Sequence, residues 1–148
     1  MSLIDDNDPI RALGFITVYS AYAEQCIDDL LDLLGEDSLK RAQATKKIRR
    51  LKEMADLFEW ANDEGERFQS LLSEAEAIFD KRGEYIHNRY IGCSNGEIIM
   101  KPGRPDRLEE KVTSGTLYEF ANFVFDMSSA FNASKFWLSR AKKKIEQV

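Results

Sequence analysis

The sequence predicts an all-α fold, an up-and-down four-helix bundle with a short β-hairpin between the third and fourth helices. Three observations lead to this prediction: four apolar stripes at steps of three and four residues, mostly short links, and one longer insert that contains an Asn-Gly turn signal. The 148 residues are 43% hydrophobic and include eight glycines and three prolines. We therefore expect a single helical domain over residues 1–148, with the hairpin and loop insert at about 90–112.

The first two predicted helices have clear apolar faces. The first begins at Asp8, an N-cap residue followed by Pro9, and stops at Gly35. We expect the second to begin near Asp37 or Ser38 and to carry its charges away from its apolar arc. The apolar positions of the first helix are Ala12, Ile16, Tyr19, Ala23, Ile27, Leu30 and Leu34, and those of the second are Ala44, Ile48, Leu51, Ala55 and Phe58.

We expect the third helix to follow Asn62 and Asp63, and the fourth to begin near Ser114 to Thr116. Their candidate capping boxes are Asp63 with Glu66 and Thr116 with Glu119. The apolar positions of the third are Phe68, Leu72, Ala75, Phe79 and Ile86, and those of the fourth are Leu117, Phe120, Val124, Met127, Phe131, Leu138 and Ala141. The basic residues Arg140 and Lys142 to Lys144 suit the negative pole at the end of the fourth helix. Between the two helices, Asn95-Gly96 flanked by apolar residues predicts the hairpin, followed by a Pro/Gly loop.

Composition excludes several function classes. The net charge of −5 argues against a domain that holds nucleic acid by bulk electrostatics. One histidine excludes a histidine-rich zinc site, and neither a dinucleotide-binding nor a phosphate-loop motif is present, so we expect no metal and no cofactor. Cys26 and Cys93 lack metal-ligand spacing and suit a reducing compartment. With no apolar stretch of spanning length, we expect a cytoplasmic protein without membrane association.

A basic cluster on the second helix contrasts with the acidic remainder. Five of its residues are expected opposite the apolar arc: Lys46, Lys47, Arg49, Arg50 and Lys52. These side chains either contact phosphates, with Lys46, Lys47 and Arg50 as nucleic-acid-binding candidates, or simply solvate the helix. The acidic residues of the first helix, Asp28, Asp29 and Asp32, are expected on a solvated face.

The stretch KRGEYIHNRY, residues 81–90, holds the single histidine. Arg82 falls in the apolar register of the third helix, so its guanidinium needs an acidic side chain, a bound phosphate or a path to water. His87 lies about 140° around the helix and about 7.5 Å along it from Arg82. The pair can share a site if the helix ends near His87, if the arginine reaches around, or if a second subunit supplies the matching pair.

Arg82-Gly83-Glu84-Tyr85-Ile86-His87 in this helical context resembles the R-x4-6-H motif of the HEPN superfamily. Many members of that superfamily are metal-independent endoribonucleases in toxin–antitoxin or phage-defence systems, and they usually act as dimers. Others are non-catalytic binding or scaffolding modules. The resemblance therefore implies a homodimer, single-stranded RNA as substrate and a possible antitoxin protein as partner. The alternative is a non-catalytic dimeric interaction module or a nucleotide- or RNA-binding module.

The resemblance also implies roles for individual residues. His87 would transfer protons and Arg82 would stabilise the charge of the transition state, while Lys81 and Arg89 would hold neighbouring phosphates. Gly83 stands where nuclease members commonly carry a polar residue, often asparagine, and Glu84 would take over the orientation of the imidazole. A third interpretation needs no site. In it, the first and fourth helices together form an interface between copies of the chain, with aromatic residues of the fourth helix such as Phe123, Phe125, Phe136 and Trp137.

Overall fold

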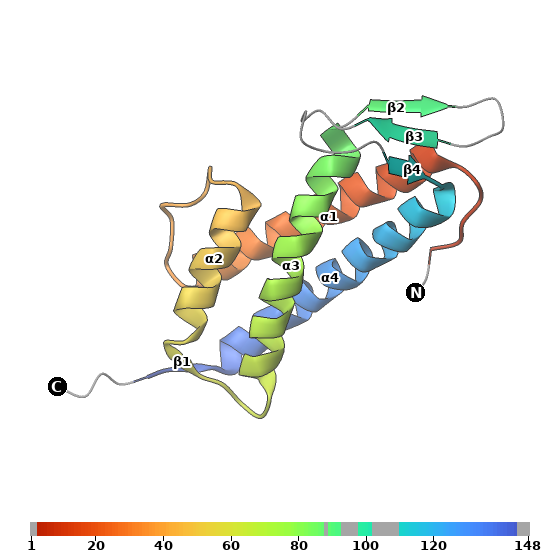
Figure 1. Cartoon of the computed structure of the whole chain (residues 1–148). Coiled ribbons are helices and arrows are strands. Elements are labelled where there is room, and N and C mark those ends of the chain that lie inside the picture. The colour runs from red at the N-terminus through yellow and green to blue at the C-terminus, as the bar shows by residue number, and fades with distance from the viewer. Residues whose placement is uncertain (1–2, 88, 93–97, 102–109, 145–148) are drawn as a thin grey trace.

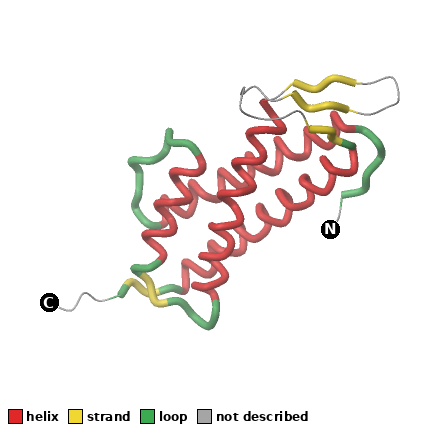
Figure 2. Tube along the Cα trace, viewed as in Figure 1, coloured by secondary structure: helices red, strands yellow, loops and turns green. Residues whose placement is uncertain are grey.

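The computed structural model describes residues 3–87, 89–92, 98–101 and 110–144, and in these ranges it confirms the all-α four-helix bundle (Figure 1). Small strands lie at both ends of the helices (Figure 2). The elements in chain order are α1 (Pro9–Leu33), α2 (Ala44–Ala55), β1 (Phe58–Glu59), α3 (Glu64–His87), β2 (Arg89–Gly92), β3 (Ile98–Lys101), β4 (Glu110–Val112), α4 (Ser114–Arg140) and β5 (Lys142–Lys143). None of the described helices is both long and apolar enough to cross a membrane.

Helices α1 and α4 lie side by side and run in the same direction (Figure 1). Their N-terminal ends are joined through the Tyr118 hydroxyl, which donates to Asp6 at 2.5 Å. Further along, Lys135 of α4 donates to Asp29 of α1 at 2.6 Å. The order α2, α3, α4 alternates in direction. The link over residues 34–43 carries the chain back along the bundle before α2 begins, so α1 runs parallel to α4.

The core lies where the four helices meet, and the predicted stripes supply most of it. Its largest fully buried side chains include Ile16, Ile27, Leu30, Ile48, Leu51, Phe68, Leu72, Leu117, Val124 and Phe131. Cys26 is buried as a small apolar side chain, and burial raises the pKa of its thiol. The buried leucine, isoleucine, valine and phenylalanine side chains each stabilise the fold by about 1.5–3 kcal/mol when they leave water.

The short segment before α1 is bound to the start of α4. The Leu3 N–H donates to Asn122, and the Ser114 hydroxyl donates to Asp5 at 2.9 Å. Burial and the hydrogen bond to Asp6 raise the pKa of Tyr118 to about 12. The same hydrogen bond lowers the pKa of the Asp6 carboxyl. These contacts hold the N-terminal ends of α1 and α4 together.

The boundaries of α1 follow the sequence, whereas the start of α2 does not. Asp8 caps α1 by accepting from the Arg11 N–H at 3.1 Å, and Gly35 follows the helix with a φ of 73°. Helix α2 begins at Ala44 rather than near Asp37 or Ser38. The Ser38 hydroxyl donates to Glu36 at 2.5 Å, and short polar side chains that bond locally in this way favour turns over helix.

Helix α4 begins at Ser114, within the predicted start, but its N-cap and its C-terminal end differ from the prediction. The N-cap is Thr113, whose hydroxyl accepts from the Thr116 N–H at 3.1 Å, so the capping box expected at Thr116 is wrong. The helix ends at Arg140, and Ala141 is extended, with φ −71° and ψ 144°. The following lysines therefore do not extend the helix. They form β5, which pairs antiparallel with β1, Phe58 with Lys143 and Glu59 with Lys142.

The predicted hairpin is formed by β2 and β3, which pair antiparallel from Arg89 with Lys101 to Gly92 with Ile98. Its Asn95-Gly96 turn, Cys93 and the Pro/Gly loop lie outside the described residues. A third strand, β4, pairs with β3 and was not predicted, because its three residues show little periodicity. Met100 and Val112 are buried and fix the sheet against the bundle.

Three helical glycines provide a matched test of the packing. A Cβ at Gly14 or Gly83 would meet no atom within 4 Å, whereas a Cβ at Gly65 would lie 2.8 Å from the Trp60 ring. We expect Gly14→Ala and Gly83→Ala each to raise the free energy of unfolding by about 1 kcal/mol, because alanine favours the helix. Gly65→Ala should lower it by about 1–2 kcal/mol through overpacking. Urea unfolding measures all three, and a stabilising Gly65→Ala would contradict the packing of Trp60.

Candidate functional site

Arg82 projects from α3 toward the middle of α1. The positions that precede it in the apolar register of α3, among them Leu72, Ala75 and Phe79, are buried. The Arg82 side chain retains 25% exposure, so its stem is covered while its guanidinium has access to solvent. The prediction of a partly enclosed arginine is therefore confirmed.

The partners of Arg82 come from α1. Its Nε donates to the Ser20 hydroxyl at 2.8 Å, and its NH1 nitrogen lies 3.6 Å from the Glu24 carboxylate. Ser20 and Glu24 are one turn apart, so both face the same neighbouring helix. Of the three partners that the sequence left open for Arg82, the structure supplies an acidic side chain. Neither Ser20 nor Glu24 was predicted.

The sequence held only a partial signal for these partners. Ser20 is completely buried, one turn after Ile16 and between other buried residues of α1. A buried hydroxyl requires a hydrogen-bonding partner. The Ser20 hydroxyl also donates to the Thr17 carbonyl within α1 at 3.1 Å, so its burial marked a polar position on this face without indicating that Arg82 would meet it.

Helix α3 ends at His87, which meets one of the conditions for bringing the histidine and Arg82 together. The helix then gives way to β2, whose first residue is Arg89. The side chains of His87 and Arg89 lie outside the described residues, so their predicted roles stay predictions.

Tyr85 anchors this end of α3 and was missed in the sequence, where Ile86 was assigned to the apolar stripe. The Tyr85 ring is buried and packs edge-on against Phe120 with the centroids 5.0 Å apart. The Tyr90 hydroxyl of β2 donates to the Tyr85 carbonyl, and this bond ties the strand to the helix. The packing thus fixes the backbone two residues before His87.

Lys81 and Glu84 interact with each other. The Lys81 ammonium lies 3.1 Å from the Glu84 carboxylate and 4.9 Å from the centroid of the Tyr85 ring. Lys81 therefore has an anionic partner in the chain. Its role toward phosphate stays a prediction. The space next to Gly83 is open, since an added Cβ would meet nothing within 4 Å.

The basic cluster of α2 is largely neutralised by acids of the same chain. Arg50 interacts with Glu36 at 3.2 Å and Glu53 at 3.0 Å, while Arg49 and Lys52 both reach Glu76. Within the described part of the chain, Lys46 is exposed and makes no ion pair. Little unbalanced charge remains on this helix for phosphate contacts.

Lys47 corrects the prediction that this residue projects opposite the apolar arc. Its side chain is only 6% exposed, and its ammonium donates to Asp28 of α1 at 2.7 Å. The reason is tertiary packing: α2 packs on the C-terminal half of α1, and α1 covers the flank of α2 that carries Lys47. Asp28, Asp29 and Asp32 are likewise more than a solvated face, since each interacts with a lysine of another segment.

The aromatic residues of α4 divide between core and surface. Phe120 and Phe131 are buried, and Trp137 packs at the edge of the core with the Arg67 guanidinium 4.7 Å from its ring centroid. Phe123 and Phe136 are exposed, Phe136 by 73%. Among the described residues, no three histidine, cysteine, aspartate or glutamate side chains gather as metal ligands would.

In comparisons with known proteins, no family model, no curated protein and no solved structure matches the chain. The candidate site is therefore defined by its own contacts. These are a guanidinium held between α3 and α1, the end of α3 at His87, and the anchor at Tyr85.

The buried Lys47 can be tested by breaking its ion pair from either side. Asp28→Asn should lower the free energy of unfolding by about 2 kcal/mol, because it leaves an enclosed ammonium without its anion. Lys47→Met should change the free energy of unfolding by less than about 1 kcal/mol, because it removes the enclosed charge, which then needs no partner. Asp32→Asn, in an exposed pair, is the control and should change it by less than about 0.5 kcal/mol. A milder effect for Asp28→Asn than for Lys47→Met in denaturant unfolding would contradict this account.

Proposed function

We propose that the protein is a metal-independent endoribonuclease that cuts single-stranded RNA through Arg82 and His87 in a homodimer, in a toxin–antitoxin or phage-defence setting. The observation that supports the proposal is the fixed guanidinium of Arg82 close to the end of α3. Ser20 accepts one of its five N–H groups, and among the described residues Glu24 is the one carboxylate beside it. Donors remain for the oxygens of a phosphate.

The chemistry requires a proton acceptor, a proton donor and a stabilised phosphorane. His87 would accept the proton of a ribose 2′-hydroxyl as its oxygen attacks phosphorus. The bond from phosphorus to the 5′-oxygen then breaks, and that oxygen takes up the proton that His87 carries, leaving a 2′,3′-cyclic phosphate and a neutral His87. Arg82 would stabilise the added negative charge, and its hydrogen bond to Ser20 would keep it oriented.

A second candidate is a non-catalytic dimeric module that binds RNA, a nucleotide or an anionic protein. Two observations favour it. Glu24 already offsets part of the Arg82 charge, and Gly83 supplies no side chain beside the pair. In this case Arg82 would contribute to binding and His87 would shape the surface.

The test is cleavage of single-stranded RNA in EDTA by purified wild-type protein and variants. We expect His87→Ala and Arg82→Ala each to slow cleavage about a hundredfold, because each removes a group that acts in the transition state. Lys40→Ala is the control, since this exposed lysine pairs with Asp32 and Asp37 and has no proposed role at the site, and it should cleave within about twofold of wild type.

Equal cleavage by wild type and both site variants would contradict the proposal and indicate a contaminating nuclease. Absence of cleavage together with RNA binding that Arg82→Ala weakens would instead favour the non-catalytic module. Circular dichroism and thermal unfolding of each variant separate loss of activity from loss of fold.

A further inference from the structure

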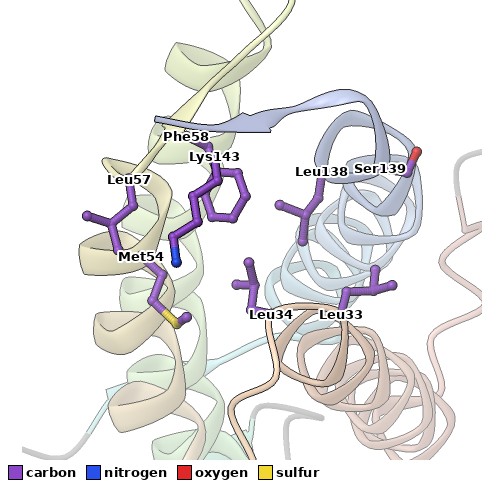
Figure 3. Close-up of a pocket in the computed structure, with 8 residues that line it drawn as sticks. All are labelled: Leu33, Leu34, Met54, Leu57, Phe58, Leu138, Ser139 and Lys143. Carbon is purple, nitrogen blue, oxygen red and sulfur yellow. The ribbon is translucent and has the colours of Figure 1, made fainter. Parts of the chain in front are cut away.

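A cavity of about 340 Å³ opens at the end of the bundle away from the β2–β3–β4 sheet (Figure 3). It lies where α1, α2 and α4 end and where the β1–β5 pair crosses between them. Its lining residues come from all of these segments: Leu33, Leu34, Met54, Leu57, Phe58, Leu138, Ser139 and Lys143. Six of the eight side chains are apolar, so the cavity offers a ligand an apolar wall.

Among the described residues that line the cavity, Lys143 is the one that carries a charge. Alternation along a strand sends Lys142 and Lys143 to opposite faces of β5, and Lys143 is in register with Phe58, which also lines the cavity. Figure 3 shows the Lys143 side chain leaving β5 toward the space between Met54, Leu34 and Leu138, with its nitrogen at the tip. Throughout the described part of the chain, no carboxylate lies within 4.0 Å of this ammonium.

Part of this apolar lining remains in contact with water. Leu33 and Leu57 are 60% and 48% exposed, although both are large hydrophobic residues. A ligand that covered them would be favoured by the removal of this apolar surface from water. The cavity is at the lower end of the size range of small-molecule sites, roughly 300–1,000 Å³, so the ligand must be short.

The polar groups determine the charge of the ligand head. The Ser139 hydroxyl already donates to the Phe136 carbonyl at 2.7 Å, so Lys143 is left as the donor that faces the cavity. A single ammonium matches one carboxylate, whereas a doubly charged phosphate would require more donors. We propose that this cavity binds a short amphipathic carboxylate, with its aliphatic tail against the leucines and its head on Lys143. This site is independent of the proposed ribonuclease activity.

The test is titration of the full chain with octanoate, followed by amide NMR shifts and by calorimetry. We expect saturable binding with shifts concentrated at the backbone of Leu33, Leu34, Leu57, Leu138 and Lys143. Octylammonium should not bind, because its head carries the same charge as Lys143. Hexanoate should bind roughly tenfold more weakly, since two fewer CH₂ groups leave water.

Charge variants at the two adjacent lysines decide the role of Lys143. Lys143→Gln should raise the Kd for octanoate about fivefold, and Lys143→Glu should transfer the preference to octylammonium. Lys142→Gln, on the opposite face of β5, should leave the Kd within about twofold of wild type. The proposal would be overturned by absence of octanoate binding, by shifts located elsewhere in the molecule, or by an equal effect of the two glutamine variants.

Discussion

The parallel packing of α1 against α4 is the constraint on which the rest of the structure depends. The Asp6–Tyr118 hydrogen bond and the Asp29–Lys135 ion pair fix the two helices relative to each other. With α1 held in this way, α2 and α3 pack against the pair, and one face of α1 presents Ser20 and Glu24 to α3. The same arrangement brings the C-terminal ends of α1 and α4 beside the end of α2, where the apolar cavity lies.

Much of the fold could be predicted because helices repeat their pattern over many residues. The stripes of all four helices supply most of the buried core, and Asp8, Pro9 and Gly35 delimit α1 as expected. The errors fall where the structure depends on contacts distant in sequence. Residues 37–43 bond locally instead of joining α2, and the lysines after Arg140 leave the helix because β1 offers them a strand partner. The direction of α1 relative to α4 is likewise set by tertiary packing.

Of the candidate site, the sequence predicted the contribution of α3 and not that of α1. The register of α3 predicted that Arg82 would be enclosed and would need a partner, but periodicity alone does not say which helix faces it. Ser20 and Glu24 became visible only when α1 and α3 were placed together. Lys47 shows the opposite failure, since a lysine assigned to the wet face of α2 is covered by the neighbouring helix and satisfied by Asp28. Charge on a helix predicts exposure only where no other element covers it.

The central claim is that Ser20 and Glu24 orient the Arg82 guanidinium while leaving donors free for phosphate. The most direct measurement is the NMR signal of the Arg82 Nε–H group, assigned with Arg82→Lys, during titration with a 2′-O-methyl RNA oligonucleotide that cannot be cleaved. We predict a resolved signal in the free protein, because Ser20 accepts this hydrogen, and a saturable shift when the oligonucleotide binds. An Nε–H signal that is unchanged at saturation would contradict the account. So would an affinity for the oligonucleotide that Arg82→Ala leaves unchanged.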